Sequence, residues 1–315
     1  MLFIDAVETD PSLNLAMEEH LFFNKTEEIF MLWQNRPSII IGKNQNALSE
    51  IDYDYVKAHD IKVVRRLSGG GAVYHDEGNL NFTYIVNREG FGDYVGFTET
   101  FRSSLSSLGL SAEVSGRNDV LVDGKKISGN AQYQHHGRLL HHGTILIGAD
   151  MTHLSKALKP DPEKIQSKGI ASVKSRVVNL STLCGLDAAA FRKAFADFFL
   201  KTEGGEPYHF TEEDMAAAKK LQEEKYNTYA WNFGYSPRYA FTKKTRISGG
   251  TVEVHLDIQN GKIMKAGIFG DFLEDGEKIR ACILNAEHSE EGIRFALNDV
   301  QLSTLDKEQL ISCFL

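Results

Sequence analysis

The sequence predicts an α+β protein with a large N-terminal domain, residues 1–241, and a small C-terminal α+β domain, residues 242–315. Three observations support this prediction. Strand-like apolar runs and segments of helical periodicity are interspersed over the first part of the chain. An aromatic, turn-rich segment follows at 229–237. Beyond it, alternating runs at 251–258 and 262–269 flank Asn260-Gly261, and helical patterns follow at 275–283, 290–297 and 306–314.

Turn and capping residues set the predicted element boundaries in the large domain. Asp10-Pro11-Ser12 is typical of a helix start, because proline is tolerated in the first helical turn. Asn35-Arg36-Pro37 lies between two apolar runs and predicts a hairpin, and Asp123-Gly124 predicts a two-residue hairpin. The expected strands are 2–7, 29–33, 38–41, 61–64, 80–86, 114–122, 125–128 and 139–147, and the expected helices are 13–21, 52–59, 97–108, 151–158, 188–200 and 212–226.

The composition restricts the classes of partner. The chain has 315 residues and a net charge of -8, which argues against a global attraction to nucleic acid or to acidic membranes. No apolar run approaches membrane-spanning length, and the first residues do not resemble a signal peptide. The three cysteines, Cys184, Cys282 and Cys313, are far apart and odd in number, so we expect a reducing compartment, the cytoplasm.

The most informative stretch is 65–79, where Gly69-Gly70-Gly71 lies between two apolar runs. Consecutive glycines are costly to order, so they are expected where the backbone takes unusual dihedral angles or comes very close to another group. Arginine, serine, histidine, aspartate and asparagine side chains surround this triplet, which favours a loop that holds an anionic ligand over a purely structural turn. Neither a G-x-G-x-x-G fingerprint nor a Walker A motif is present.

The predicted hairpin at 123–124 places a second set of polar residues on one strand face. A regular register pairs Leu121 with Lys126 and Asp119 with Ser128, and directly opposed residues share a face. This face would then carry a lysine, an aspartate and a serine beside a single aliphatic side chain, which is unusual for a core. The pattern alone leaves a binding site and a solvated face equally open.

Histidines and cysteines give weaker signals. The histidine pairs at 135–136 and 141–142 lack the spacing of a zinc site, and we expect His142 to form hydrogen bonds beside Gly143-Thr144. The cysteines lie away from both polar stretches, which disfavours a cysteine nucleophile.

The segment 171–179 is basic and polar. It could be a solvated loop. Lys174 and Arg176 also supply the charge and the hydrogen-bond donors with which a loop could close over the phosphates of a nucleotide. Its composition alone does not separate these two interpretations.

Several motifs occur in a fixed order over most of the chain. They are Arg65-Arg66-x-Ser68-Gly-Gly-Gly-Ala-Val-Tyr-His75-Asp76-x-Gly78-Asn79, Gly116-Arg-Asn-Asp119, Lys126-Ile-Ser-Gly129, His142-Gly143-Thr144, Ser172-Val-Lys-Ser-Arg176 and Trp231-Asn-Phe-Gly234. This ordered set resembles the lipoate–protein ligase A family. The resemblance rests on the order of the motifs rather than on any one of them.

The resemblance implies a catalytic domain related to biotin ligases, with a mixed β-sheet packed by helices, and a small C-terminal accessory domain. It implies an ATP-dependent ligase that converts lipoate to lipoyl-AMP and pyrophosphate and then transfers the lipoyl group to a lysine of an acceptor domain. The implied acceptors are dehydrogenase E2 subunits and the glycine-cleavage H protein. Because no sulfur-specific ligand lies near the glycine triplet, we expect burial to sense the acyl chain and octanoate to support some turnover.

Carried over by position, Lys126 is the implied catalytic residue, because a compact ammonium can offset charge where carboxylate and phosphate meet. The segment 171–178 is implied to cover the adenylate. Mg²⁺ would accompany ATP, with Asp119 as a candidate contact. The alternatives are a lipoyl or octanoyl transferase of the same fold, which would need a cysteine acyl-enzyme, and a non-catalytic lipoate-binding protein. The residues implied to bind ATP or lipoyl-adenylate are Arg66, Ser68, Gly70, Gly71, Ala72, Val73, Tyr74, His75, Asn118, Asp119, Lys126, His142, Lys174 and Arg176.

Overall fold

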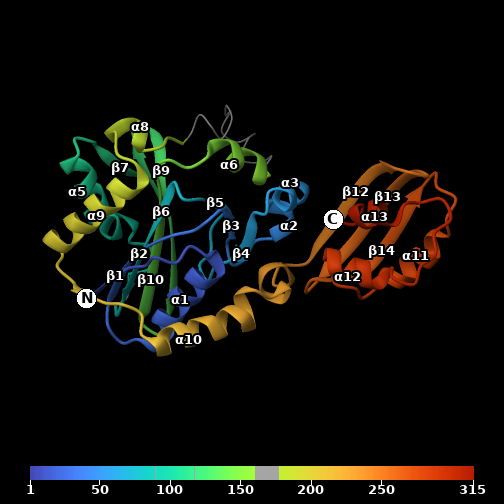
Figure 1. Ribbon diagram of the computed structural model, residues 1–315, viewed down its shortest axis with the longest axis horizontal. Helices are drawn as coiled ribbons and strands as arrows, with labels where there is room; N and C mark the ends of the chain where they lie inside the picture. The colour runs from blue at the N-terminus through green and yellow to red at the C-terminus, as the bar shows by residue number, and fades with distance from the viewer. Residues whose placement is uncertain (89, 117, 160–176) are drawn as a thin grey trace. The chain divides into compact units, whose positions relative to one another are not determined.

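The computed structural model describes residues 1–88, 90–116, 118–159 and 177–315, and these residues form two compact units (Figure 1). The first unit comprises Met1–Gln45 and Ser49–Asn227, and the second comprises Asn46–Leu48 and Thr228–Leu315. The second unit begins before residue 242, because strand β12 (Tyr239–Ile247) already pairs with a strand of that unit from its first residue onward.

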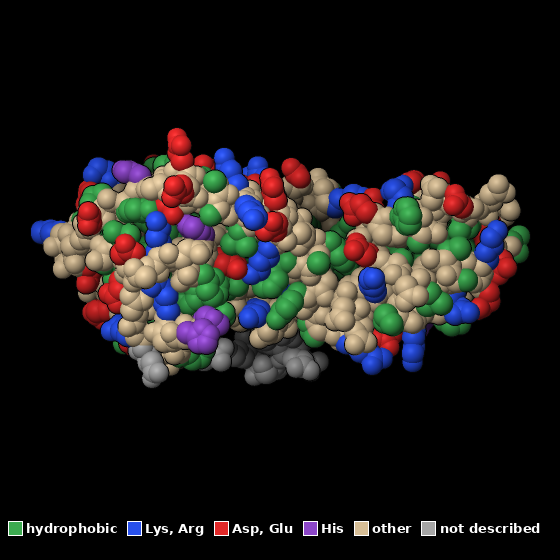
Figure 2. All heavy atoms as spheres, turned by 90° about the horizontal axis from the view of Figure 1, so that it is seen from below, with side chains coloured by type: hydrophobic (Ala, Val, Ile, Leu, Met, Phe, Trp, Pro, Cys, Tyr) green, Lys and Arg blue, Asp and Glu red, His purple; other side chains and the backbone are tan. Residues whose placement is uncertain are grey.

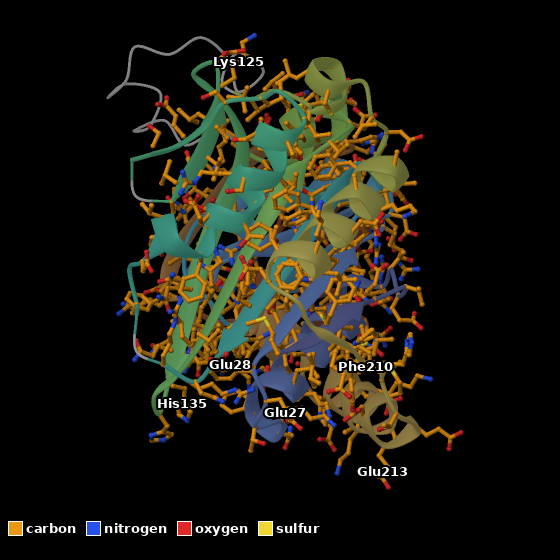
Figure 3. The ribbon with its side chains drawn as sticks, turned by 90° about the vertical axis from the view of Figure 1, so that its left-hand side faces the viewer. Glu27, Glu28, Lys125, His135, Phe210 and Glu213 are labelled. Carbon is orange, nitrogen blue, oxygen red and sulfur yellow. The ribbon has the colours of Figure 1, made fainter. Side chains whose placement is uncertain are left out.

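The first unit is built on a mixed eight-stranded sheet in the order β11-β1-β2-β6-β10-β9-β8-β7. β1 runs parallel to β2 and β11, and the other neighbouring strands are antiparallel. The ends of β9, Lys125 and His135, lie at opposite ends of the sheet (Figure 3). The strands are β1 Leu2–Asp5, β2 Ile29–Gln34, β6 Asn79–Val86, β7 Ala112–Ser115, β8 Asp119–Val122, β9 Lys125–His135, β10 Arg138–Leu146 and β11 Glu206–Pro207.

A separate three-stranded sheet has the order β4-β3-β5 and consists of β3 (Ser38–Ile41), β4 (Lys62–Arg65) and β5 (Val73–His75). The hairpin predicted at 35–37 is therefore wrong, because β2 and β3 belong to different sheets. Asn35 is buried where the chain crosses between them. Its side chain bonds to Asn14 and His75, so the chain is anchored at this point and does not reverse within one sheet.

Helix α1 is buried on nearly every side. The Asp10 carboxylate accepts hydrogen bonds from the backbone of Ser12 and Leu13, and Pro11 lies in the first turn, so the predicted helix start is confirmed. The helices up to the end of the first unit are α1 Pro11–Asn24, α2 Ala47–Glu50, α3 Tyr53–Ala58, α4 Tyr94–Phe97, α5 Glu99–Ser107, α6 Met151–Ala157, α8 Ser181–Cys184, α9 Ala188–Thr202, α10 Glu212–Leu221 and the π-helical turn η2 Gln222–Tyr226.

The large sheet presents different chemistry on its two faces. One face buries an aromatic core against α5 and α9, where Phe30 stacks on Phe199 at a centroid distance of 3.8 Å. Successive residues of a strand point to opposite faces, so the neighbours of these core residues, such as Trp33 and Asn81, point to the other face. That second face is covered by α1 and by the small sheet, and it carries polar residues as well as apolar ones.

The second unit combines a three-stranded antiparallel sheet with helices. Alternate residues of its central strand, from Val252 to Ile258, are buried. The turn predicted at Asn260-Gly261 is confirmed, because both residues have positive φ, 53° and 72°. An α+β class is confirmed for this unit and for the whole chain. Its elements are η3 Ala230–Gly234, β12 Tyr239–Ile247, β13 Gly250–Gln259, β14 Lys262–Gly270, α11 Gly276–Ile283, α12 Glu290–Ala296 and α13 Lys307–Ser312.

The molecular surface shows no dominant charge on the face seen in Figure 2, where acidic and basic side chains are interspersed. A mixed surface of this kind does not create the one-sign field that steers a protein toward nucleic acid. In the part of the chain that the structure describes, no helix combines the length and the apolar character needed to cross a membrane.

Candidate active site

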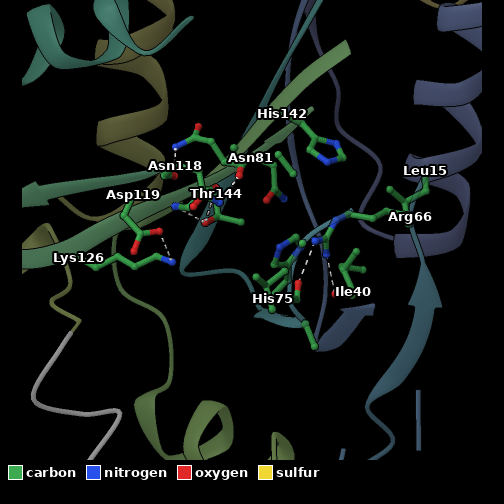
Figure 4. A pocket seen from close by; sticks show the side chains of 18 of the residues that line it. Leu15, Ile40, Arg66, His75, Asn81, Asn118, Asp119, Lys126, His142 and Thr144 are labelled. Atoms are coloured by element: carbon green, nitrogen blue, oxygen red, sulfur yellow. Dashed lines mark hydrogen bonds and ion pairs between the residues drawn. The ribbon is translucent and has the colours of Figure 1, made fainter. Parts of the chain in front are cut away.

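A cavity of about 390 Å³ lies in the first unit, between the large sheet and the small one (Figure 4). Its walls come from β2, β6, β8, β9 and β10 of the large sheet, from β3, β5 and the glycine loop, residues 66–72, and from α1. Ser68 and Tyr74 are buried but do not line it, and Lys174 and Arg176 lie outside the described residues. The family-implied residues that do line it are Arg66, Gly70, Gly71, Ala72, Val73, His75, Asn118, Asp119, Lys126 and His142.

The cavity follows one row of residues across the large sheet. Asp119 of β8 faces Gly129 of β9, which faces Thr144 of β10, and the row continues through Asn81 of β6 to Trp33 of β2. All five residues line the cavity. Neighbouring strands are about 4.8 Å apart, so the row extends roughly 14 Å from Asp119 to Asn81. The cavity is therefore elongated across the strands.

Lys126 and Asp119 form the charged end of the cavity, and Nζ of the lysine lies 2.7 Å from Oδ1 of the aspartate. Lys125, the preceding residue, is exposed at the tip of the hairpin (Figure 3). The predicted two-residue turn is confirmed, with φ of 50° at Asp123 and 70° at Gly124. The turn thus directs one lysine into the cavity and the other into solvent.

Beyond its first two pairs, the predicted register of this hairpin is wrong. A β-bulge inserts one extra residue, Ile127, into β9, so Asp119 faces Gly129 and Val120 faces Ser128. Ser128 is therefore fully buried outside the cavity, although we expected it beside the lysine. Alternation cannot reveal such a bulge, because one inserted residue moves every residue beyond it to the opposite face.

The described end of the segment 171–178 lies beside the catalytic candidate. Val177 forms a parallel bridge with Lys126, and the Val178 amide donates to the Lys126 carbonyl at 3.0 Å. The remainder of this segment, 171–176, lies outside the described residues. Its implied role over the adenylate stays a prediction.

Arg66 holds the glycine loop in place from inside the protein. Its side chain is 6% exposed and donates to the carbonyls of Ile40, Gly69 and Gly71 and to the Ser68 hydroxyl, at 2.7 to 3.0 Å. Burial lowers the pKa of Arg66 to about 10, so the guanidinium stays positively charged at neutral pH. Because its hydrogen bonds go to the loop, this residue shapes the cavity wall in addition to lining it.

Two glycines allow the loop to pack closely. Gly70 has φ of 96°, in the region that side chains rarely adopt. A Cβ atom at Gly42 would lie 2.0 Å from the Gly70 carbonyl oxygen. The expectation that the triplet needs unusual dihedrals and close approach is thus confirmed at Gly70, but the close neighbour is protein backbone.

A chain of buried hydrogen bonds links α1 to the glycine loop. His142 Nδ1 lies 2.9 Å from Glu18 Oε1, and His142 Nε2 lies 2.6 Å from Ser68 Oγ. Glu18 also accepts a hydrogen bond from the Thr83 hydroxyl at 2.7 Å, and that hydroxyl accepts one from Trp33 Nε1 at 2.9 Å. The predicted hydrogen-bonding role of His142 is confirmed. The chain leaves each of these buried groups paired.

No sequence pattern pointed to Glu18, Trp33 or Asn81. Glu18 is only 1% exposed. Helical spacing selects only the apolar positions around Glu18 and assigns no role to the glutamates, whereas α1 is buried on nearly every side. Adjacent carboxylates within an otherwise apolar helix are the signal that could have identified Glu18 before the structure was known.

The loop before β8 is held by paired asparagines. The backbone and side-chain N–H groups of Asn130 donate to the Asn118 carbonyl at 2.9 and 3.1 Å, and Asn118 Nδ2 donates to the Asn130 carbonyl at 2.6 Å. On the core side, His141 bonds to Asn130 and to Gln132 at 3.2 and 3.1 Å. These bonds hold Asp119, the first residue of β8, beside the cavity.

Acidification is expected to destabilise the first unit through His141. Burial, followed by the charge of His142, lowers the pKa of His141 to about 3, whereas an unfolded histidine titrates near pH 6.5. Between these values the unfolded chain binds the proton and the folded chain does not, so the free energy of unfolding falls as the pH falls. From pH 7 to 5.5 this one group accounts for a loss of about 1 kcal/mol.

Urea unfolding of His141→Gln measures this contribution. Trp33 fluorescence in a Trp231→Phe background reports on the first unit, because the other tryptophan lies in the second. The variant should lose about 1 kcal/mol less stability than the parent between pH 7 and 5.5, whatever its stability at neutral pH. An equally steep loss in both proteins would contradict the assignment.

The residues do not form a resident metal site in the described part of the chain, where no group of three or more His, Cys, Asp or Glu side chains is placed to hold an ion. Asp119, the candidate Mg²⁺ contact, is paired with Lys126. Mg²⁺ prefers several oxygen ligands, so this single paired carboxylate does not fit a protein-held ion.

The fold and the site define the class of this protein. The lipoyl protein ligase A/B catalytic domain matches residues 10–200, and the bacterial lipoate protein ligase C-terminus matches residues 236–314. The chain therefore belongs to the lipoate–protein ligase family. It is 42% identical over 315 residues to lipoate–protein ligase 1 of Staphylococcus aureus, with 96% of each chain covered. It is 41% identical over 314 residues to a lipoate–protein ligase of Bacillus subtilis, covering 96% of this chain and 95% of the relative.

Solved structures agree with this membership. A bipartite lipoate protein ligase of Thermoplasma acidophilum, studied with its E2 lipoyl domain, superposes with a TM-score of 0.66 and 30% identity, covering 74% of this chain and 96% of that one. A second structure from the same organism, with lipoic acid bound, superposes with a TM-score of 0.62 and 28% identity, covering 74% of this chain and 98% of that one. A lipoate-protein ligase A bound with ATP superposes with a TM-score of 0.64 and 28% identity, covering 75% of this chain and 100% of that one. The predicted mixed sheet packed by helices is confirmed.

Proposed function

We propose that this chain is an ATP-dependent lipoate–protein ligase. The observation that carries the proposal is the elongated cavity, which ends at the Lys126–Asp119 pair and is walled by a glycine loop. An acyl chain with one anionic end matches this distribution of charge. The relatives named above, which are lipoate–protein ligases, and the related structures with lipoic acid and with ATP support the same function.

In the first half-reaction, a carboxylate oxygen of lipoate attacks the α-phosphorus of ATP. The new acyl–phosphate bond forms as the bond to pyrophosphate breaks, giving lipoyl-AMP. Two anions must approach each other, so a positive charge has to offset the charge that develops. Lys126 supplies that charge at the charged end of the row, and the glycine loop presents backbone amides to the nucleotide. Arg66 keeps the loop in shape.

In the second half-reaction, the neutral amine of an acceptor lysine attacks the lipoyl carbonyl. An amide bond forms, the bond to AMP breaks, and the amine loses a proton. Dehydrogenase E2 lipoyl domains are the proposed acceptors, supported by the Thermoplasma ligase and its E2 lipoyl domain. The glycine-cleavage H protein is a further proposed acceptor. ATP would carry Mg²⁺ with it, and the three free cysteines suit a cytoplasmic location.

The test combines the purified full chain with ATP, Mg²⁺, lipoate and an acceptor lipoyl domain. We expect pyrophosphate release that depends on lipoate, and a mass increase of one lipoyl group on the acceptor. An acceptor whose lysine is replaced by arginine is the control and should stay unmodified. Absence of pyrophosphate release with every acid tested would refute the proposed function.

The three cysteines are expected to be dispensable for this reaction. No cysteine lines the cavity in the part of the chain described, and Cys313 is buried in the second unit. A triple variant, Cys184→Ser, Cys282→Ser and Cys313→Ala, should retain both half-reactions at close to the parental rate. Loss of acyl transfer in a folded triple variant would instead favour the cysteine acyl-enzyme of a transferase.

A further inference from the structure

The end of the cavity opposite Lys126 is polar in an unusual way. His75 and Asn81 line it there, and their residues are only 3% and 2% exposed. His75 Nε2 and Asn81 Nδ2 are both buried, and neither has a hydrogen-bond partner among the residues that the structure describes. Buried nitrogen donors without partners are rare in native proteins and call for a physical explanation.

Hydrogen bonds determine which nitrogen of His75 carries its proton. Asn14 Nδ2 donates to the carbonyls of Glu8 and Gln34, which can only accept, at 3.0 and 2.8 Å. The same Nδ2 lies 2.9 Å from Asn35 Oδ1, which therefore accepts, so Asn35 presents its Nδ2 to His75 Nδ1 at 3.0 Å. His75 Nδ1 is thus an acceptor, and the proton of the neutral ring lies on Nε2.

The ring stays neutral over the working pH range. Burial, followed by the positive charges of Arg66 and His142, lowers the pKa of His75 to about 3. Nε2–H is therefore a permanent donor. Asn81 shares one side-chain hydrogen bond with Asn79, in which Asn81 Oδ1 accepts from Asn79 Nδ2 at 2.9 Å, and Asn81 Nδ2 is left without a partner among the described residues.

These donors lie at the distance of the far end of an acyl chain. Asn81 belongs to the row that begins at Asp119, three strands away, and the separation of roughly 14 Å is comparable to an extended octanoyl chain held by its carboxylate at Lys126. His75 packs against Trp33, the next residue of the row, at a centroid distance of 6.2 Å. In Figure 4 the Lys126–Asp119 pair and His75 lie on different sides of the cavity.

We propose that His75 Nε2–H, together with the Asn81 amide, donates hydrogen bonds to the ring sulfurs of lipoate and so determines the preference for a dithiolane tail over a plain alkyl tail. This inference rests on the proposed ligase function and assigns these residues to the far end of its acid substrate. Sulfur is a weak but real acceptor, and it is polarisable enough to pack against the neighbouring rings.

The physical consequence is discrimination by unpaired donors. A hydrocarbon tail fills the same space but leaves both N–H groups buried without partners, and a site built to donate hydrogen bonds rejects an analogue that cannot accept them. Burial of the chain still favours octanoate, so octanoate should react, but less efficiently than lipoate. We expect a preference of about tenfold in kcat/KM from a hydrogen bond of ordinary strength.

The experiment compares three acids in the adenylation step: lipoate, octanoate and 5-cyclopentylpentanoate, which keeps the ring of lipoate but replaces both sulfurs with methylenes. Pyrophosphate release gives kcat/KM for each acid in the parent, in His75→Phe and in Asn81→Leu. His255→Phe, an exposed histidine of the second unit, is the matched control. Thermal unfolding of each variant establishes that it is folded.

The parent and His255→Phe should prefer lipoate to the cyclopentyl acid by about tenfold. In His75→Phe the ratio of kcat/KM for lipoate to kcat/KM for the cyclopentyl acid should fall toward one. The fall should come from a lower kcat/KM for lipoate, while kcat/KM for the cyclopentyl acid stays the same or rises. Asn81→Leu should move in the same direction. Retention of the full preference in both folded variants, or an equal fall with all three acids, would overturn the proposal. If no acid supports pyrophosphate release by the parent, the proposed ligase function is wrong. That result differs from the two results that would overturn the role of His75 and Asn81 alone.

Discussion

Lys126→Ala is expected to lower the rate of adenylate formation by about a hundred- to a thousandfold, or ~3–4 kcal/mol in transition-state stabilisation. Lys126 Nζ lies at the charged end of the cavity, 2.7 Å from Asp119, where carboxylate and α-phosphate would meet. The fold should be kept, because the side chain is about one-third exposed and its loss leaves no buried cavity. Transfer from supplied lipoyl-AMP should fall as well, because the same charge stabilises the departing AMP.

Two neighbouring substitutions make this prediction specific. Lys125→Ala should be nearly silent, because Lys125 is exposed at the tip of the hairpin. Lys126→Arg should recover only part of the activity, because a planar guanidinium does not replace a compact ammonium at one point. The measurements are pyrophosphate release and single-turnover transfer. A crippled Lys125→Ala beside an active Lys126→Ala would show that the wrong lysine has been assigned to the site.

Arg66→Met is expected to have the second largest effect, a fall of about a hundredfold in pyrophosphate release. The guanidinium donates to three backbone carbonyls and to the Ser68 hydroxyl, and its removal leaves these acceptors buried without their donor. Hydrogen bonds to charged groups contribute about 1.5–3 kcal/mol each, so the loop should lose the conformation that forms the cavity wall. Unfolding of the first unit, followed by Trp33 fluorescence, should move to lower urea.

The charge and the shape of Arg66 can be separated. Arg66→Lys keeps a cation but cannot reach four acceptors from one planar group, so we expect it to regain only a minor part of the lost rate. Arg246→Met removes an exposed arginine of the second unit and is the matched control, with no expected loss. Saturating ATP and lipoate should not restore Arg66→Met. Near-parental activity in that variant would mean that the loop keeps its shape without the arginine.

One side of the candidate site can be located from the sequence because the signals there are local. The glycine triplet and the arginine, serine and histidine around it lie within one short stretch of chain, and most of them line the cavity or brace its wall. The turn at Asp123-Gly124, which needs only two residues with positive φ, separates the faces of Lys125 and Lys126, and the resemblance to the ligase family assigned Lys126 to the site. The predictions failed where one residue depends on a distant partner. Glu18 meets His142 across 124 positions of sequence, and no periodicity within α1 contains that information.

By itself, the sequence determined the α+β class, the start of α1 and both two-residue turns. These features depend on backbone preferences and side-chain bonds over a few residues, which are the same in any surroundings. Only the tertiary structure decided that β3 leaves the large sheet, that a bulge at Ile127 buries Ser128, and that His75 keeps an unpaired donor at the far end of the cavity. Each of these features depends on packing between segments far apart in the chain. Local conformations of similar free energy are open to each segment, and the distant segment that packs against it selects one of them.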